Sequence, residues 1–146
     1  SNTERLNRWT AAISMFKERP ICGWGPGTYQ FQYAPFQNSK NLTLISTNSG
    51  DLGNAHSEYI GPLAETGIIG GLIFICIALY AIALGFSLVY NANNEQVRFL
   101  AISTLLGIST YLIHGFLNNY LDTDKAAIPF WGFLAILVSL DIYKKR

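Results

Sequence analysis

The longest run of uncharged residues sets the first limit on the fold of this chain. Residues 68–90 contain no Asp, Glu, Lys or Arg over about 23 positions. A helix of that length crosses a hydrocarbon core of roughly 30 Å. Inside lipid, every backbone N–H and C=O must be paired within the protein, so the run is expected to be helical. The sequence therefore predicts a membrane protein.

Two further apolar runs follow, separated by short polar connectors. Only 13% of the residues are charged, whereas about 25% is usual for a soluble domain. Most of the charge and turn residues precede residue 67. We therefore predict three transmembrane helices in residues 67–146, at about 68–90, 97–117 and 126–142.

Basic residues predict the orientation of these spans. Lys144, Lys145 and Arg146 follow the third span, and Arg98 stands at the start of the second. Short cytoplasmic segments carry an excess of Lys and Arg, which puts the C-terminus in the cytoplasm. Three spans then place residues 1–66 on the opposite, extracytoplasmic side of the membrane.

The first 19 residues are predicted to form an amphipathic helix. Pro20 ends it, because proline disfavours helical geometry at the preceding residue. The apolar face is expected to consist of residues spaced three and four apart: Leu6, Trp9, Ile13 and Phe16.

An irregular segment leads to a second extracytoplasmic helix. Glycines in residues 23–27 predict a tight turn. Asn54 is expected to cap a helix that begins near Ala55, and Gly67 is expected to end or bend it. The fold class is thus all-α, with an extracytoplasmic helix–loop–helix segment over 1–66 followed by three transmembrane helices.

Several function classes receive no support. The net charge is +1, and no basic stripe interleaved with aromatic residues indicates nucleic-acid binding. The glycine turn lacks the Lys-Ser/Thr of a phosphate loop, and no residues have the spacing of a metal site. Cys22 and Cys76 are expected to be structural residues without a disulfide. No cofactor is expected.

A histidine and two arginines are the candidates for chemistry. At a helix N-terminus the imidazole of His56 is expected to be neutral and able to accept a proton. Arg5 and Arg8 are neighbours on one helix surface, and arginine matches phosphate oxygens. We assign substrate binding to Arg8 and to Tyr59, which is expected to share a helix face with His56. The alternatives are a histidine that caps or packs, and arginines on a solvated face.

Four motifs occur in a fixed order along the chain: Arg5-x-x-x-Trp9, Pro20 to Tyr29, Ala55 to Tyr59 and Leu63 to Gly70. Their order and spacing resemble the superfamily of O-antigen ligases and O-antigen polymerase-like proteins, which includes bacterial protein O-oligosaccharyltransferases. Asp122 and the segment 130–132 also fit this resemblance. It implies that the chain is the C-terminal third or so of a longer protein.

The resemblance implies metal-independent glycan transfer at the periplasmic face of the bacterial inner membrane. The donor is a glycan on undecaprenyl pyrophosphate, and the acceptor is a hydroxyl on lipid A-core, another glycan or a protein. Arg5 matches an arginine expected to bind the pyrophosphate. His56 matches a histidine expected to orient or deprotonate the acceptor. Glu65 stands where the family often has glutamate; we assign it to substrate binding, with a helix-terminal structural role as the alternative. Further arginines lie upstream in the family, so residues 1–146 alone are expected to be inactive.

Other functions remain open at this point. The resemblance does not separate a ligase involved in lipopolysaccharide biosynthesis from a polysaccharide polymerase or a protein glycosyltransferase. A transporter or flippase for lipid-linked glycans is a second hypothesis. It requires polar groups inside the spans, which here are almost free of them. A structural membrane segment without catalysis is the third.

Overall fold

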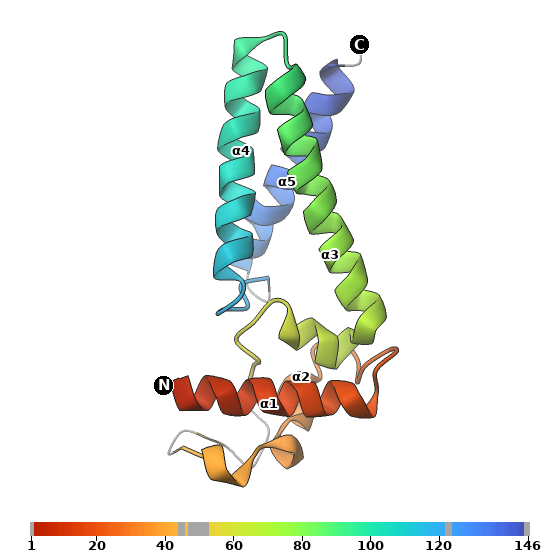
Figure 1. Ribbon diagram of the computed structural model, residues 1–146, viewed down its shortest axis with the longest axis vertical. Helices are drawn as coiled ribbons and strands as arrows, with labels where there is room; N and C mark the ends of the chain where they lie inside the picture. The colour runs from red at the N-terminus through yellow and green to blue at the C-terminus, as the bar shows by residue number, and fades with distance from the viewer. Residues whose placement is uncertain (1, 44–45, 47–52, 122–123, 145–146) are drawn as a thin grey trace. The chain divides into compact units, whose positions relative to one another are not determined.

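The fold is all-helical, as predicted. A computed structural model describes residues 2–43, 46, 53–121 and 124–144 (Figure 1). Across these ranges no strand occurs. Asp122, Lys145 and Arg146 lie outside the described residues. The helices are α1 (Asn2–Glu18), α2 (Tyr29–Gln32), η1 (Ala34–Phe36), η2 (Ser39–Asn41), α3 (Ile60–Asn91), α4 (Glu95–His114) and α5 (Asp124–Lys144).

The chain divides into two compact units. The first contains residues 1–74 together with 115–119, and the second contains 75–114 together with 120–146. Helix α3 runs from the first unit into the second.

In the part of the chain that the structure describes, three helices are long and apolar enough to cross a membrane, which confirms the predicted number of spans. They cover residues 60–91, 95–114 and 125–143. The first is longer than predicted, because it includes the expected second extracytoplasmic helix. Helix α4 packs against α5. Gly107 permits this packing, because a Cβ there would lie 2.6 Å from the ring of Phe133.

Helix α3 is interrupted at Gly67, where a bend was expected. The residue has φ of 67° and ψ of −164°, which is outside helical geometry. Left-handed φ values favour glycine because it has no Cβ. The kink therefore separates a short first arm of α3 from the long membrane helix.

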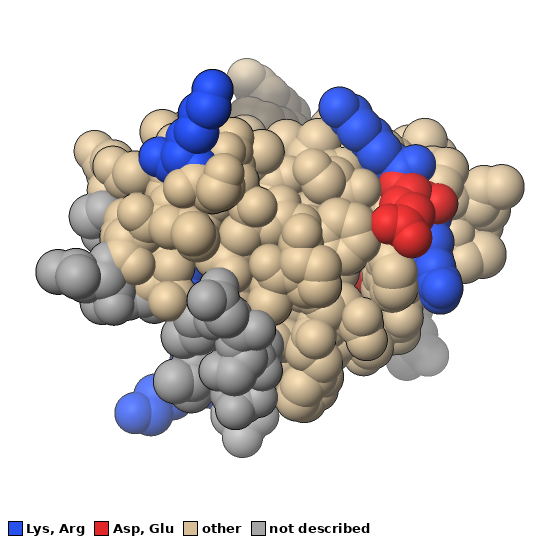
Figure 2. Space-filling view, turned by 90° about the horizontal axis from the view of Figure 1, so that it is seen from below, with Lys and Arg blue, Asp and Glu red and all other residues tan. Residues whose placement is uncertain are grey.

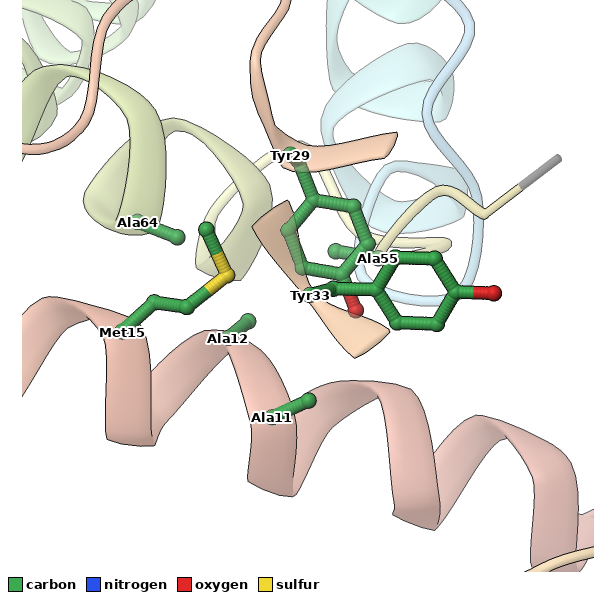
Figure 3. Packing of buried hydrophobic residues seen from close by; sticks show 7 residues of the cluster. All are labelled: Ala11, Ala12, Met15, Tyr29, Tyr33, Ala55 and Ala64. Atoms are coloured by element: carbon green, nitrogen blue, oxygen red, sulfur yellow. The ribbon is translucent and has the colours of Figure 1, made fainter. Parts of the chain in front are cut away.

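The core of the first unit is built from small residues and two tyrosines. The rings of Tyr29 and Tyr33 are stacked, with centroids 5.2 Å apart and planes inclined by 13°. The Tyr29 hydroxyl donates to the Arg8 carbonyl oxygen at 2.8 Å, and burial raises the pKa of that hydroxyl. Small side chains along α1 let the tyrosines approach its backbone (Figure 3). The full cluster is Ala11, Ala12, Met15, Tyr29, Tyr33, Ala55 and Ala64.

The predicted apolar face of α1 is wrong. Leu6 is 55% exposed and Ile13 44% exposed, while Trp9 and Phe16 are half-buried. The buried face instead consists of Glu4, Asn7, Arg8, Ala11, Ala12 and Met15.

Hydrogen bonds explain why α1 buries polar residues. The Asn7 amide donates to Gln37 Oε1 at 3.0 Å and accepts from the Asn38 N–H at 2.9 Å. A buried polar group with partners no longer bears the full cost of leaving water. Periodicity alone does not reveal such partners, because they lie about 30 residues away in sequence.

Candidate functional site

His56 lies in a turn before α3, so its predicted position in the first helical turn is wrong. The Asn54 side chain accepts from the His56 N–H at 3.0 Å, which closes a local turn. Ser57, rather than Asn54, caps the helix. Its Oγ accepts from the N–H groups of Tyr59 at 3.3 Å and Ile60 at 3.4 Å.

The backbone of His56 is held in a strained conformation. Its φ of 48° lies in the left-handed region, which no other non-glycine residue in the described ranges adopts. Such a conformation costs on the order of 1–3 kcal/mol and persists only where the surroundings enforce it. Here Ala55 and Ser57 are buried on either side. The Glu58 N–H donates to the carbonyls of Gly115 at 2.8 Å and Asn118 at 3.2 Å. A rigid turn therefore presents the half-buried imidazole.

Arg8 ties α1 to this turn. Its Nε donates to Glu4 Oε1 at 2.9 Å, and a terminal nitrogen donates to the Asn54 carbonyl oxygen at 3.4 Å. Its guanidinium also lies 5.9 Å from the Tyr33 ring centroid. Arg8 is only 7% exposed, so the alternative of a solvated helix face is wrong for it. Arg5, one turn before it on α1, is half-buried.

Glu4 belongs to this group although sequence analysis did not select it. Its carboxylate accepts from Arg8, from Thr43 Oγ1 at 2.6 Å and from Ser46 Oγ at 2.7 Å. Burial raises the pKa of the Glu4 carboxyl, but hydrogen bonds from Thr43, Ser46 and Arg8 outweigh burial and hold the pKa below its ordinary value. Glu4 is thus ionised and fixes the guanidinium. No local pattern identifies it, because Thr43 and Ser46 lie about 40 residues away.

The imidazole of His56 favours the neutral form, as expected. Burial lowers its pKa most, and the charges of Arg8 and then Arg5 lower it further, against an opposing effect of Glu4. The predicted cause, a helix N-terminus, is wrong because α3 begins at Ile60. The structure thus brings both arginines within electrostatic reach of the histidine. A neutral imidazole has a ring nitrogen that can accept a proton, and the positive charge of the arginines makes that nitrogen a weaker base.

Glu65 holds the glycine turn through its carboxylate. Its Oε2 accepts from the Gly27 N–H and its Oε1 from the Tyr29 N–H, each at 2.9 Å. Its own carbonyl accepts from the Gly25 N–H at 2.7 Å. Both carboxylate oxygens therefore serve the fold, which favours the structural alternative over the predicted substrate-binding role.

Replacing Glu65 by alanine is expected to destabilise the first unit by about 2–4 kcal/mol. The reason is that two backbone donors then lose a charged acceptor. Glu65→Gln keeps one acceptor oxygen and is expected to cost about half as much. Thermal unfolding of the purified full-length protein, followed by Trp fluorescence, measures the difference. Equal stability of the alanine variant and the unmodified protein would contradict this role.

Tyr59 packs in an aromatic cluster. Its ring centroid lies 4.5 Å from that of Phe116 and 5.9 Å from that of Phe74. Burial and then the charge of Glu58 raise the pKa of its hydroxyl. The expected shared helix face with His56 is wrong, because His56 precedes the helix. Its assignment to substrate binding remains a prediction.

The two cysteines are not joined in a disulfide. Cys22 and Cys76 are free, exposed thiols. Within the described ranges, no group of three or more His, Cys, Asp or Glu side chains is placed to hold a metal ion.

A family model described as O-antigen ligase matches residues 1–75. This chain belongs to the O-antigen ligase family. The matched region contains α1, the glycine turn, the His56 turn and the kink in α3. Family membership and three membrane-spanning helices make the chain part of a bacterial membrane protein.

The chain is also similar to an individual protein along most of its length. An uncharacterized protein of Haemophilus influenzae is 23% identical over 137 residues, which cover 92% of this chain and 33% of the relative. The chain thus spans about a third of the length of that relative. No solved structure matches.

Proposed function

We propose that the full-length protein transfers a glycan from undecaprenyl pyrophosphate to a hydroxyl acceptor on lipid A-core, another glycan or a protein. The observation that supports this most is the His56 turn. It offers a half-buried imidazole whose pKa is lowered by burial, Arg8 and Arg5. This group lies within the region that matches the O-antigen ligase family.

His56 and Arg5 divide the chemistry in this proposal. The imidazole of His56 accepts the proton of the acceptor hydroxyl, whose oxygen forms a bond to the anomeric carbon of the donor sugar. The bond from that carbon to the pyrophosphate oxygen breaks, and the electron pair leaves with the lipid diphosphate. The Arg5 guanidinium stabilises the negative charge that develops there.

Arg8 has a different part in the proposed reaction. Its guanidinium is engaged with Glu4 and the Asn54 carbonyl, and its charge lowers the pKa of His56. We therefore treat Arg8 as a positioning residue for the histidine. Arg5 is the more accessible of the two arginines, which supports its assignment to the pyrophosphate.

The proposed reaction takes place outside the cytoplasm. The basic residues after the third span and Arg98 at the start of the second support a cytoplasmic C-terminus. Three spans then place the His56 turn at the periplasmic face of the inner membrane, where a membrane-anchored donor and an acceptor meet.

An assay of the full-length protein in proteoliposomes tests this function. Transfer from an undecaprenyl-pyrophosphate glycan to lipid A-core, a glycan or a protein is expected to continue in EDTA. A lowered pKa keeps His56 unprotonated to lower pH, so the acidic limb of kcat/KM should lie below the ordinary histidine value of 6.5. Product is measured by mass spectrometry across pH 4–8.

Three results count against the proposal. One is no transfer to any of the three acceptor classes. A second is activity that EDTA abolishes and Mg²⁺ restores. A third is an acidic limb above pH 6.5, which would indicate that the essential base has a raised rather than a lowered pKa.

A further inference from the structure

A cavity of about 350 Å³ lies between α4 and α5, entirely within the second unit. Its size falls in the range of small-molecule and cofactor sites, roughly 300–1,000 Å³. None of the residues that line it belongs to the His56 site. The proposed glycan transfer does not use it.

The positions of the lining residues along the two helices define the ends of the cavity. His114, Tyr120 and Lys125 lie where α4 ends and α5 begins. Gly107 and Phe133 lie about two turns further along the helices, and Thr110 and Tyr111 line the part between. Gly107 lies seven residues before the end of α4, and Phe133 lies eight residues after Lys125. At about 1.5 Å per residue, the two ends are on the order of 10–12 Å apart along the helices.

The polar and apolar ends of the cavity match the polar and apolar zones of a membrane. The α4 span ends at His114 and the α5 span begins at Lys125. The polar end of the cavity therefore coincides with the boundary between hydrocarbon and headgroups, where lysine and tyrosine side chains are common. The aromatic end lies at hydrocarbon depth.

Pro129 adds a polar backbone group to the cavity wall. Pro129 lies inside α5 and lines the cavity. It has no N–H to donate to the carbonyl of Lys125 four residues before it. Within a membrane, backbone freed in this way is tolerated where it lines a cavity rather than where it faces lipid tails.

We infer that this cavity binds an anionic membrane phospholipid. The lipid phosphate lies at Lys125, whose side chain is exposed and whose ammonium complements the negative charge. One acyl chain lies along the apolar wall that includes Phe130 and Phe133. The inference is independent of the proposed glycan transfer, because it concerns a different unit and a different set of residues.

Native mass spectrometry of the detergent-purified full-length protein tests the inference. Phosphatidylglycerol is compared with phosphatidylcholine, glycerol phosphate and undecaprenyl phosphate as added ligands. Lys125→Gln is expected to lower retention of phosphatidylglycerol about fivefold, the typical contribution of one basic side chain near a lipid phosphate. Lys17→Gln, an exposed lysine on α1, is the matched control and should change nothing.

A second pair of variants tests whether the lipid occupies the cavity itself. Ala126 lines the cavity, and Ala126→Phe is expected to fill it and reduce retention at least tenfold. Ala127→Phe adds the same ring at the neighbouring position as a control. If Ala126→Phe fails to fold, Lys125→Gln still decides, because it changes only an exposed charge.

Three outcomes would overturn the assignment. One is equal retention of phosphatidylglycerol by the unmodified protein, Lys125→Gln and Ala126→Phe. A second is binding of glycerol phosphate as strong as that of the lipid, because the apolar end then contributes nothing. A third is displacement of phosphatidylglycerol by undecaprenyl phosphate at equal concentration, which would make the site specific for a polyprenyl chain.

Discussion

Replacing His56 by asparagine is expected to lower glycan transfer by the full-length protein roughly 10²- to 10⁴-fold, the usual contribution of a general base. Asparagine is chosen because it tolerates positive φ better than most residues. The turn with its φ of 48° should therefore persist. The amide cannot take the proton, so kcat should fall while the protein remains folded in the membrane.

Arg5→Ala is expected to cost a similar amount, roughly 10²- to 10³-fold, through lost stabilisation of the leaving diphosphate. It should also raise the pKa of His56, because the charge of Arg5 lowers that pKa. NMR titration of the imidazole measures this second effect independently of turnover. Lys17→Ala, an exposed residue of the same helix, is the control and should leave both quantities unchanged.

The product assay in proteoliposomes decides these assignments. Undiminished transfer by His56→Asn would remove the histidine from the chemistry. Undiminished transfer by Arg5→Ala, with an unchanged His56 pKa, would show that the arginine acts on neither the donor nor the base.

Replacing Gly23 by alanine is expected to destabilise the first unit severely. A Cβ at this position would lie 2.4 Å from the backbone C and O of Glu65 and 2.7 Å from the backbone N of Gly67. These atoms belong to the backbone at the α3 kink and cannot rotate away. With a φ of +66° in addition, the cost is expected to be on the order of 4 kcal/mol or more.

Gly27→Ala measures the cost of the left-handed backbone conformation without the steric clash that a side chain meets at Gly23. Gly27 has a similar φ of +73°, but a Cβ there would meet nothing within 4 Å. Its replacement should cost only about 1–2 kcal/mol, the cost of a left-handed conformation for an L-residue. Thermal melting of the two purified variants and their levels in membranes measure the difference. Similar losses for both would show that the close approach at Gly23 is not what limits stability.

The membrane helices were the most predictable part of the fold. Their signal is local: a long uncharged run must be helical in lipid, and Gly67 marks the kink because no other residue fits its φ so readily. The face of α1 was predicted wrongly for the opposite reason. Asn7 and Glu4 are buried through partners far along the chain, and hydrophobic periodicity carries no information about them.

The candidate site was only partly predictable. The residue pattern predicts His56 and Arg5 as candidates and the family resemblance supports both, but their electrostatic relation depends on tertiary structure. Glu4 was missed because its partners Thr43 and Ser46 have no sequence signature. The cap was placed at Asn54 rather than Ser57, because both residue types favour caps. Only the left-handed His56 between them distinguishes the two positions.

Main-chain hydrogen bonds join the glycine turn to the kink in α3. Ile68 N–H donates to the Pro20 carbonyl at 2.8 Å, and Trp24 N–H to the Ala64 carbonyl at 3.1 Å. Main-chain groups exist at nearly every position, whatever the amino acid. The main-chain bonds at this turn therefore do not depend on the identity of the side chains that Ile68 and Trp24 carry.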